Sequence, residues 1–459
     1  MKHFLETLIA RAWNRTTARR DHTRVARGLY LGAHVVDGIP TKGRVEIPHN
    51  RRAEHLAVLG KTGSGKSFLL RSLARQDILA SRGFRYYDLH GDATPFLLGT
   101  IADQEKALKR NLDDRLILVR PDDSEMSVGI NFLESRNGNS RFVQIAEFIQ
   151  VLKQRWHLDS FGARTDELLR NSLYVLAENG LTLLELGLLL SHSTFRASCM
   201  NKVANAEVRQ YFELRYDSVS EPMRATMREP ILNKLSAFTV DPHFRHIIGQ
   251  RHSTFSLIDA MDRDYWIIFD LPKGKLGEQT ATFGSLCLTM DKYALFSRHT
   301  RSLSTMYCDE IQNLVAYGSG LETMLSEARK FAVSIASANQ FLDQYPPEMR
   351  AAILAVGTHI FFQLSSSDAQ QVAAALDGGK ALAEILKNLP RRHFVVKTGA
   401  ERWQQAVVPT LAEPKTDPSD LIARCRARWA RKRSDIETEI RQRQAVVTRK
   451  TNEALNGWK

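Results

Sequence analysis

Short apolar runs and longer helical segments alternate along most of the chain. The run HLAVLG (55–60) leads into a glycine-rich loop, after which apolar residues at helical spacing continue until Gly83. Further strand candidates are residues 84–92, 116–121, 264–272, 304–310, 332–340, 358–365 and 393–399. Apolar strands that alternate with helices predict an α/β fold with a mainly parallel central sheet covered on both faces.

The pattern changes between residues 135 and 250, where helical stretches such as SRFVQIAEFIQVLKQRW dominate without a convincing strand. We therefore expect an all-helical domain at 135–250, inserted between the two parts of an α/β domain at 55–134 and 251–412. Residues 1–54 are expected to form a basic arm and two or three small strands. Residues 413–459 read as a basic helical tail, which either binds DNA or an acidic partner or, our preferred interpretation, is solvated surface.

Composition narrows the class of protein. The 459 residues include 43% hydrophobic residues, enough for a large core, but no run long enough to span a membrane and no signal-peptide core. The four cysteines form no CxxC pair, which favours reduced thiols in the cytoplasm. The formal net charge of +13 favours an anionic partner such as nucleic acid. We expect any membrane contact to be made through partner proteins.

The loop GKTGSGKS (60–67) fits the phosphate-binding pattern GxxxxGK[ST] and lies between a strand and a helix, as that motif requires. Glycines let the backbone amides approach a phosphate, Lys66 is expected to reach the β- and γ-phosphates, and the Ser67 hydroxyl to bind Mg²⁺. The alternative is a flexible Gly/Ser turn. The expected ligands are ATP and Mg²⁺, and the expected nucleotide-binding residues are Gly60, Lys61, Thr62, Gly63, Ser64, Gly65, Lys66, Ser67 and Phe68.

Two acids follow an apolar strand in STMYCDE. Asp309 suits the magnesium shell and Glu310 suits activation of the attacking water, although paired acids are also a common polar boundary of a strand. Gln340 follows the next strand, where its amide could sense the γ-phosphate or simply face solvent. Arg329, between these strands, is either a solvated helix residue or an arginine that completes a neighbouring subunit's site.

These residues resemble the HerA/FtsK superfamily of hexameric DNA-pumping ATPases, and within it the coupling proteins of conjugative type IV secretion. The resemblance rests on GKTGSGKS, YYDLHGD, FGARTDELLRNSL, DEIQNL, LSEARKFAVSIASANQ and THIFFQLSSSDAQQVAAAL. It implies a RecA-like P-loop NTPase fold. It also implies catalytic roles for Lys66, Glu310, Gln340 and an arginine finger, which is either Arg329 or the adjacent Lys330.

The same resemblance implies a homo-hexamer that pumps DNA through a central channel, without base specificity and with possible relaxosome or secretion-system partners. It departs from the family at the start, where the segment before Gly60 contains neither the membrane anchor of coupling proteins nor the larger β-barrel of HerA-type ATPases. Two alternatives therefore stay open: a HerA-like DNA-processing ATPase with a nuclease partner, and an ATP-switched docking protein with little translocation. In DLHGD, the acids and His90 are interpreted as turn residues or as groups near the nucleotide.

Overall fold

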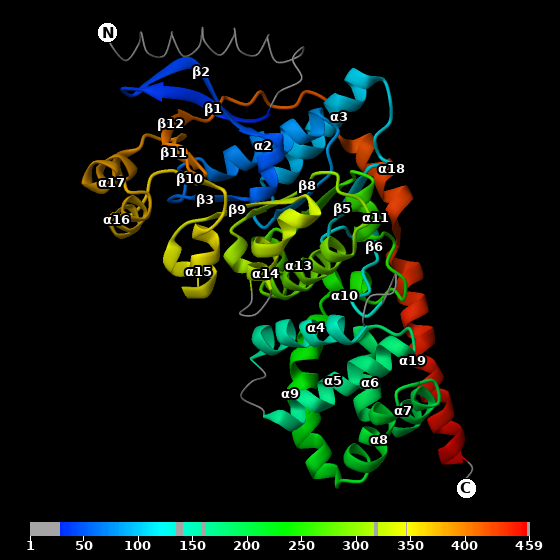
Figure 1. Cartoon of the computed structure of the whole chain (residues 1–459). Helices are drawn as coiled ribbons and strands as arrows, with labels where there is room; N and C mark the ends of the chain where they lie inside the picture. Colours follow the sequence, from blue (N-terminus) through cyan, green and yellow to red (C-terminus); the bar gives the residue numbers. More distant parts are fainter. Residues whose placement is uncertain (1–27, 135–140, 158–161, 316–319, 346, 457–459) are drawn as a thin grey trace.

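A computed structural model of the chain describes residues 28–134, 141–157, 162–315, 320–345 and 347–456. The predicted basic arm at residues 1–27 lies outside these residues. An 11-stranded sheet crosses the upper half of the molecule in Figure 1, in the order β2-β1-β12-β11-β10-β3-β9-β8-β4-β7-β5. Its strands are β1 (Gly28–Val36), β2 (Ile39–Pro48), β3 (Leu56–Leu59), β4 (Phe84–Asp88), β5 (Leu116–Val119), β7 (Trp266–Asp270), β8 (Ser304–Asp309), β9 (Val333–Asn339), β10 (Thr358–Phe361), β11 (His393–Thr398) and β12 (Gln404–Val407).

The seven strands from β10 to β5 run parallel, and the remaining four are antiparallel additions at one edge. Parallel strands that are buried on both faces carry continuous apolar runs, which is why the sequence identified most of them. The predicted α/β fold with a mainly parallel sheet is therefore confirmed. The small strands β1 and β2 join this same sheet instead of forming a separate unit.

Alternate residues of each central strand pack against opposite faces of the sheet. In β7, Trp266 and Ile268 join one core, while Ile267 and Phe269 join the other. The first face is covered by α2 (Lys66–Leu79), α3 (Ala93–Leu108) and α18 (Ser419–Trp429). The second is covered by α11 (Leu257–Asp262), α13 (Gln279–Ser297), α14 (Leu321–Glu327) and α15 (Pro347–Leu354), and near β10 and β11 by α16 (Ser366–Ala375) and α17 (Gly379–Asn388).

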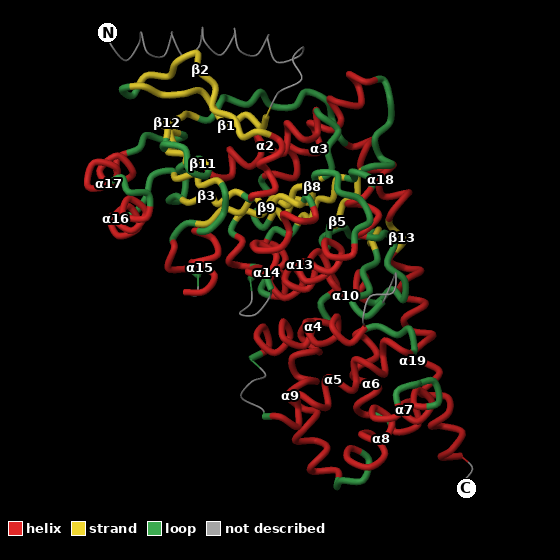
Figure 2. Tube along the Cα trace, viewed as in Figure 1, coloured by secondary structure: helices red, strands yellow, loops and turns green. Residues whose placement is uncertain are grey.

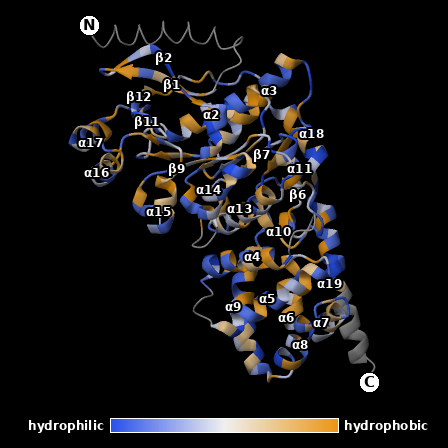
Figure 3. Ribbon diagram, in the orientation of Figure 1, coloured by the Kyte–Doolittle hydropathy of each residue, from blue (hydrophilic) through white to orange (hydrophobic). Residues whose placement is uncertain are grey.

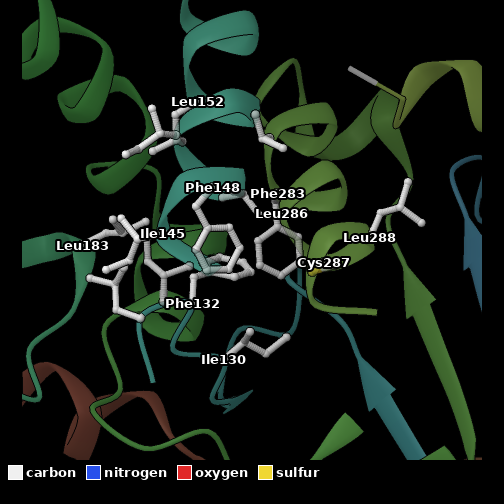
Figure 4. Close-up of a cluster of buried hydrophobic side chains, with 14 of the residues drawn as sticks. Ile130, Phe132, Ile145, Phe148, Leu152, Leu183, Phe283, Leu286, Cys287 and Leu288 are labelled. Atoms are coloured by element: carbon white, nitrogen blue, oxygen red, sulfur yellow. The ribbon is translucent and has the colours of Figure 1, made fainter. Parts of the chain in front are cut away.

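A group of helices lies below the sheet (Figures 1 and 2). It consists of α4 (Arg141–Trp156), α5 (Ala163–Glu178), α6 (Leu186–Ser191), α7 (Ser193–Met200), α8 (Ala206–Gln210), α9 (Glu221–Thr239) and α10 (Pro242–Ile248). Phe148 of α4 makes an edge contact with Phe132, which in turn contacts Phe283 of α13, at ring distances of 5.7 and 5.9 Å. Figure 4 shows these rings within one apolar cluster. The helical group thus shares a continuous core with the sheet, and the predicted domain boundaries stay a prediction.

Shorter elements complete the described chain. They are η1 (His49–Glu54), η3 (Leu183–Glu185), η4 (Tyr211–Tyr216), α12 (Lys273–Leu276), η5 (Ile311–Asn313), η6 (Ala328–Phe331) and η7 (Leu342–Gln344). Three strands were not expected from the sequence: β6 (Met126–Val128), β12 and β13 (Ala430–Lys432). Two of these have only three residues, too few for a period to emerge, and β12 begins with two glutamines.

The basic tail is two helices, α18 and α19 (Arg433–Asn456), separated by β13. Its interpretation as solvated surface is wrong for α18 and the first turns of α19. Leu421 and Ile440 are buried, Arg426 lies 2.5 Å from Asp123, and Arg443 lies 2.9 Å from Glu185 of the helical group. The tail runs from the sheet down the side of the helical group (Figure 1), so its arginines neutralise carboxylates of the body.

No helix among the described residues is both long and apolar enough to cross a lipid bilayer. In Figure 3, polar and apolar positions are interspersed along the long helices α4, α9 and α13.

Candidate nucleotide-binding and catalytic site

Three neighbouring parallel strands bring the predicted motifs to one edge of the sheet. Leu59 at the end of β3 pairs with Asn339 at the end of β9, and Asp309 at the end of β8 pairs with Ala338. The residues that come next are Gly60, Gln340 and Glu310. The phosphate loop, the amide and the acids therefore meet at the carboxyl ends of adjacent strands, where ligands bind in open α/β sheets.

The phosphate loop has a backbone that only glycine adopts readily. Gly65 has φ +126°, and a Cβ at Gly60 would lie 2.6 Å from the Cβ of Phe362. The Lys66 ammonium folds back into the loop, where it donates to the carbonyl oxygens of Gly60 (2.6 Å) and Lys61 (3.2 Å). Burial lowers the pKa of Lys66, and the nearby carboxylates oppose that shift. The two carbonyls occupy the Lys66 ammonium in place of an anion. A phosphate bound in the loop would take over as its partner.

Asp309 fits the role of a metal-shell residue. Its side chain is buried, and its Oδ1 has no hydrogen-bond partner among the described residues. Burial raises the pKa of Asp309, while the Ser67 hydroxyl and the Lys66 ammonium lower it. A buried carboxylate oxygen without a partner, beside a hydroxyl and facing a phosphate loop, is the donor set that Mg²⁺ prefers.

Glu310 and Gln340 are in direct contact. The Gln340 amide Nε2 donates to Glu310 Oε1 at 2.8 Å, and the Gln312 amide donates to the other carboxylate oxygen. Glu310 has a left-handed backbone (φ 55°) and is only 7% exposed. The two amides fix the direction of a carboxylate that stands next to Asp309 and the loop.

Arg329 lies at the opposite edge of the sheet from the loop of its own chain. It belongs to η6, which precedes β9, so the whole length of β9 lies between Arg329 and Gln340. Its side chain is 68% exposed, and its guanidinium lies 3.4 Å from the carboxylate of Glu54, which precedes β3. Lys330 is equally exposed but is paired with Glu327 at 2.6 Å. Neither cation is brought to the loop of the same chain.

One feature of the site and one feature that supports it had no signal in the sequence. Arg392, just before β11, donates its backbone N–H to Ser64 O at 2.8 Å, and its guanidinium lies 4.1 Å from the centre of the Phe68 ring. At the opposite edge of the sheet, Arg52 and Asp77, near the end of the helix that follows the loop, form a fully buried ion pair. Both contacts join residues far apart in the sequence, which only the sheet order brings together.

In the DLHGD segment (88–92), Asp88 acts as a turn residue, which is one of the two interpretations of its acids. The Asp88 carboxylate accepts hydrogen bonds from the backbone N–H groups of Gly91, Ala93 and Thr94, at 2.9, 3.0 and 2.7 Å. It therefore caps the first turn of α3. His90 is exposed.

No protein-family profile and no curated protein matches the chain. Solved structures do match. The bacterial conjugative coupling protein TrwB, in its ΔN70 form, has 16% sequence identity and a TM-score of 0.57 over 88% of this chain and 94% of that chain. TrwB in complex with the non-hydrolysable ATP analogue ADPNP has 17% identity and a TM-score of 0.60 over the same shares. VirB4 of Thermoanaerobacter pseudethanolicus has 14% identity and a TM-score of 0.55, over 85% and 98%.

These similarities show the fold. The chain has the RecA-like fold of TrwB and VirB4 across most of its length, and the resemblance predicted from the sequence is confirmed at this level. TrwB has also been solved with ADP and Mg²⁺.

Proposed function

We propose that this protein is an ATPase that assembles as a hexamer and pumps DNA through a central channel, in conjugative transfer by a type IV secretion system. One observation carries the proposal. The phosphate loop, Asp309 and the Glu310–Gln340 pair share one edge of the sheet, while the only predicted finger residues lie at the other edge. Each subunit would therefore contain every predicted catalytic group of the ATPase site except the arginine finger, and its own finger would complete the site of a neighbouring subunit.

The chain's own residues divide the work of hydrolysis. The loop amides and Lys66 hold the β- and γ-phosphates, and Ser67 with Asp309 would hold the Mg²⁺ ion that neutralises phosphate charge. Glu310, held by two amides, orients the attacking water and accepts its proton. Gln340 donates a hydrogen bond to this carboxylate and would lie beside the γ-phosphate. Its amide could therefore change partner when the γ-phosphate binds or leaves.

The finger is expected to act between subunits. Arg329 is exposed, and its partner Glu54 belongs to the same chain. When subunits associate head to tail, the arginine exchanges this carboxylate for the neighbour's γ-phosphate and stabilises transition-state charge there. Hydrolysis then weakens the contact between two subunits and shifts one against the other.

The link to DNA rests on the net charge of +13 and on the conjugation proteins whose fold the chain shares. Lys and Arg that bind phosphates would grip DNA without reading bases, and this binding weakens as salt rises. The HerA-like and docking alternatives use the same site. The docking protein differs in one measurable respect, because its turnover would be indifferent to DNA.

The first test measures ATP hydrolysis by purified protein with and without DNA, at a concentration where rings form. We expect DNA to stimulate turnover several-fold. Lys66→Ala and Glu310→Gln should each lower it by at least about 100-fold, consistent with the loss of a catalytic charge or base. Turnover that DNA leaves unchanged would favour the docking protein, and absence of turnover in the wild type would overturn the ATPase itself.

The second test mixes two inactive variants, Lys66→Ala and Arg329→Ala. In a mixed ring, some loops with an intact lysine face a neighbour with an intact arginine, so activity should return. A tag on one variant verifies that both enter the same ring, and Lys330→Ala is the matched control expected to retain most activity. If verified mixed rings stay inactive, the finger does not act between subunits through Arg329.

A further inference from the structure

Two arginines without a carboxylate partner, Arg71 and Arg392, lie beside the phosphate loop. Among the described residues, Arg71 and Arg392 have no ion pair with a carboxylate, and the Nε of Arg71 is buried without a hydrogen-bond partner. Arg392 lies above one side of the Phe68 ring, at 4.1 Å, and Arg71 lies 5.6 Å from the same ring. Positive charges gathered without carboxylates favour an anionic ligand.

Arg392 is attached directly to the loop. Its N–H donates to Ser64 O at 2.8 Å, and its own carbonyl accepts from Val408 N–H at 3.0 Å. A Cβ at Gly65 would lie 3.2 Å from the Arg392 Cα, so the two backbones touch. The backbone of Arg392 is left-handed (φ 68°), a conformation that is uncommon outside glycine and costs free energy. The position of this side chain at the loop is therefore built into the fold.

The sheet order indicates which part of a nucleotide Arg392 would meet. Glu310 and Gln340, which mark the γ-phosphate, follow β8 and β9 on one side of β3. Arg392 precedes β11, beyond β10, on the other side of β3. A triphosphate that lies along the loop with its γ end near Glu310 has its α-phosphate near Gly65 and Phe68, where Arg392 is placed.

We propose that Arg392 binds the α-phosphate of the nucleotide through its guanidinium, with Arg71 adding positive charge near the same Phe68 ring. The inference rests on the proposed function and adds a residue of the same chain to its site. In the free protein the Phe68 ring holds the guanidinium in place by a cation–π contact. Burial and the charges of Arg391 and Arg71 lower the pKa of Arg392, a shift that a bound phosphate would offset.

The contact has a specific consequence for binding. ATP, ADP and GDP all carry an α-phosphate, so loss of the Arg392 side chain should weaken all three by a similar factor, about 10- to 100-fold for a charge-assisted hydrogen bond. Arg329 is different, because a γ-phosphate contact affects ATP and leaves ADP unchanged. Arg392→Ala keeps the backbone hydrogen bonds to Ser64 and Val408, which isolates the side chain.

The experiment compares wild type, Arg392→Ala and Arg392→Lys by calorimetry with ADP, GDP and a non-hydrolysable ATP analogue. Arg391→Ala, the exposed neighbour, is the matched control expected to bind as the wild type does. Phosphorus NMR of bound ADP supplies a second measurement. The α-phosphorus resonance should move between wild type and Arg392→Ala while the β resonance stays, and Arg392→Lys should fall between them.

Three results would overturn the inference. Unchanged affinities would make Arg392 a surface residue, and a loss confined to ADP and the ATP analogue would indicate base recognition. A loss of affinity accompanied by shifts of both the α and the β phosphorus resonances of ADP would mean that the side chain only supports the loop. If the wild type itself bound no nucleotide, the proposed function would fail first, so the two failures are distinguishable.

Discussion

His55 shows how one residue at the edge of the sheet combines burial, strain and charge. It lies between η1 and β3, is 2% exposed and has a left-handed backbone (φ 67°). Its Nδ1 accepts a hydrogen bond from the Ile335 N–H at 3.1 Å, which requires an unprotonated nitrogen. Burial lowers the pKa of His55 to about 4, and the charge of Arg329 lowers it further, against a backbone hydrogen bond that raises it.

Acid should therefore destabilise the protein through this residue. Between pH 6.5 and about pH 4 the unfolded chain binds a proton at His55 and the folded chain does not, so the free energy of unfolding decreases as the pH falls. The decrease attributable to His55 reaches up to about 3 kcal/mol. Urea unfolding at a series of pH values measures it.

The matched variant is His55→Asn, because asparagine tolerates left-handed backbone and its Oδ1 can accept from Ile335 without titrating. Its unfolding free energy should depend less on pH over that interval. Parallel pH curves for the two proteins would contradict the assignment.

The sequence predicted the places of individual site residues where those residues belong to a short motif. Lys66 and Ser67 stand in one loop and Asp309 and Glu310 in one strand end, so their places follow from local spacing. The direct Gln340–Glu310 contact depends on β9 lying between β3 and β8. Arg392 could not be found in this way, since neither its neighbours in sequence nor its residue type distinguishes it from a surface arginine.

At the scale of elements, a buried polar network holds the loop helix to the strand of the acids. Arg52 of η1 forms two hydrogen bonds with Asp77 of α2, at 2.7 and 2.6 Å, and one with Thr305 of β8 at 2.8 Å. The Tyr307 hydroxyl donates to Asp77 at 2.7 Å. Burial raises the pKa of Tyr307, so the hydroxyl stays a donor. The network fixes α2, and with it the phosphate loop, against β8.

Removing one partner of the Arg52–Asp77 pair should lower the free energy of unfolding much more than replacing both partners with apolar residues. Asp77→Ala leaves a buried guanidinium without its charge partner and should lower the free energy of unfolding by roughly 3 to 5 kcal/mol. The double variant Arg52→Met/Asp77→Leu removes both charges and should recover most of that loss. Thermal and urea unfolding of the three proteins test this, and a cost below about 1 kcal/mol for the single variant would show that the pair contributes little.

Elements were predictable from the sequence where apolar periodicity was strong. Each core strand from β3 to β11 lies within or beside an expected apolar run, because burial on both faces demands such runs. The three-residue strands β6 and β13 form a two-stranded sheet with each other, and the tail's arginines pair with carboxylates in distant elements. Such contacts depend on the tertiary arrangement, which a local pattern does not contain.

At the scale of the whole molecule, the tail ties the sheet to the helical group. Cys425 of α18 is buried beside β5, where its thiol donates to Leu116 O at 3.2 Å. Arg443 of α19 donates to Gly249 O at 2.6 Å as well as binding Glu185. Ile440 packs into the core that the helical group and the sheet share. The sheet and the helical group are therefore joined in two places: through α13 in their shared core, and through the tail along the outside.

A substitution that detaches the first turns of α19 should leave α18 packed against the sheet. Ile440→Asp puts an unpaired carboxylate into the shared core, which is unfavourable, so the first turns of α19 should separate from α7 and α10. Hydrogen exchange should rise in α19 and α10 by at least about 10-fold and stay unchanged in α18. Gln442→Ala, at an exposed position on the same helix, is the control. Equal exchange in Ile440→Asp and the control would mean that the tail does not stabilise this junction.

Strand β9 has a consequence for the order of events in an assembled ring. Its seven buried residues form a stiff rod about 23 Å long, with the amide that touches Glu310 at one tip and the exposed guanidinium just beyond the other. In the proposed ring, an axial displacement of β9 at the first tip would also move the second tip. If the subunits assemble into the proposed hexamer, each would transmit its nucleotide state to one neighbour, and the sites would hydrolyse ATP in a fixed rotational order.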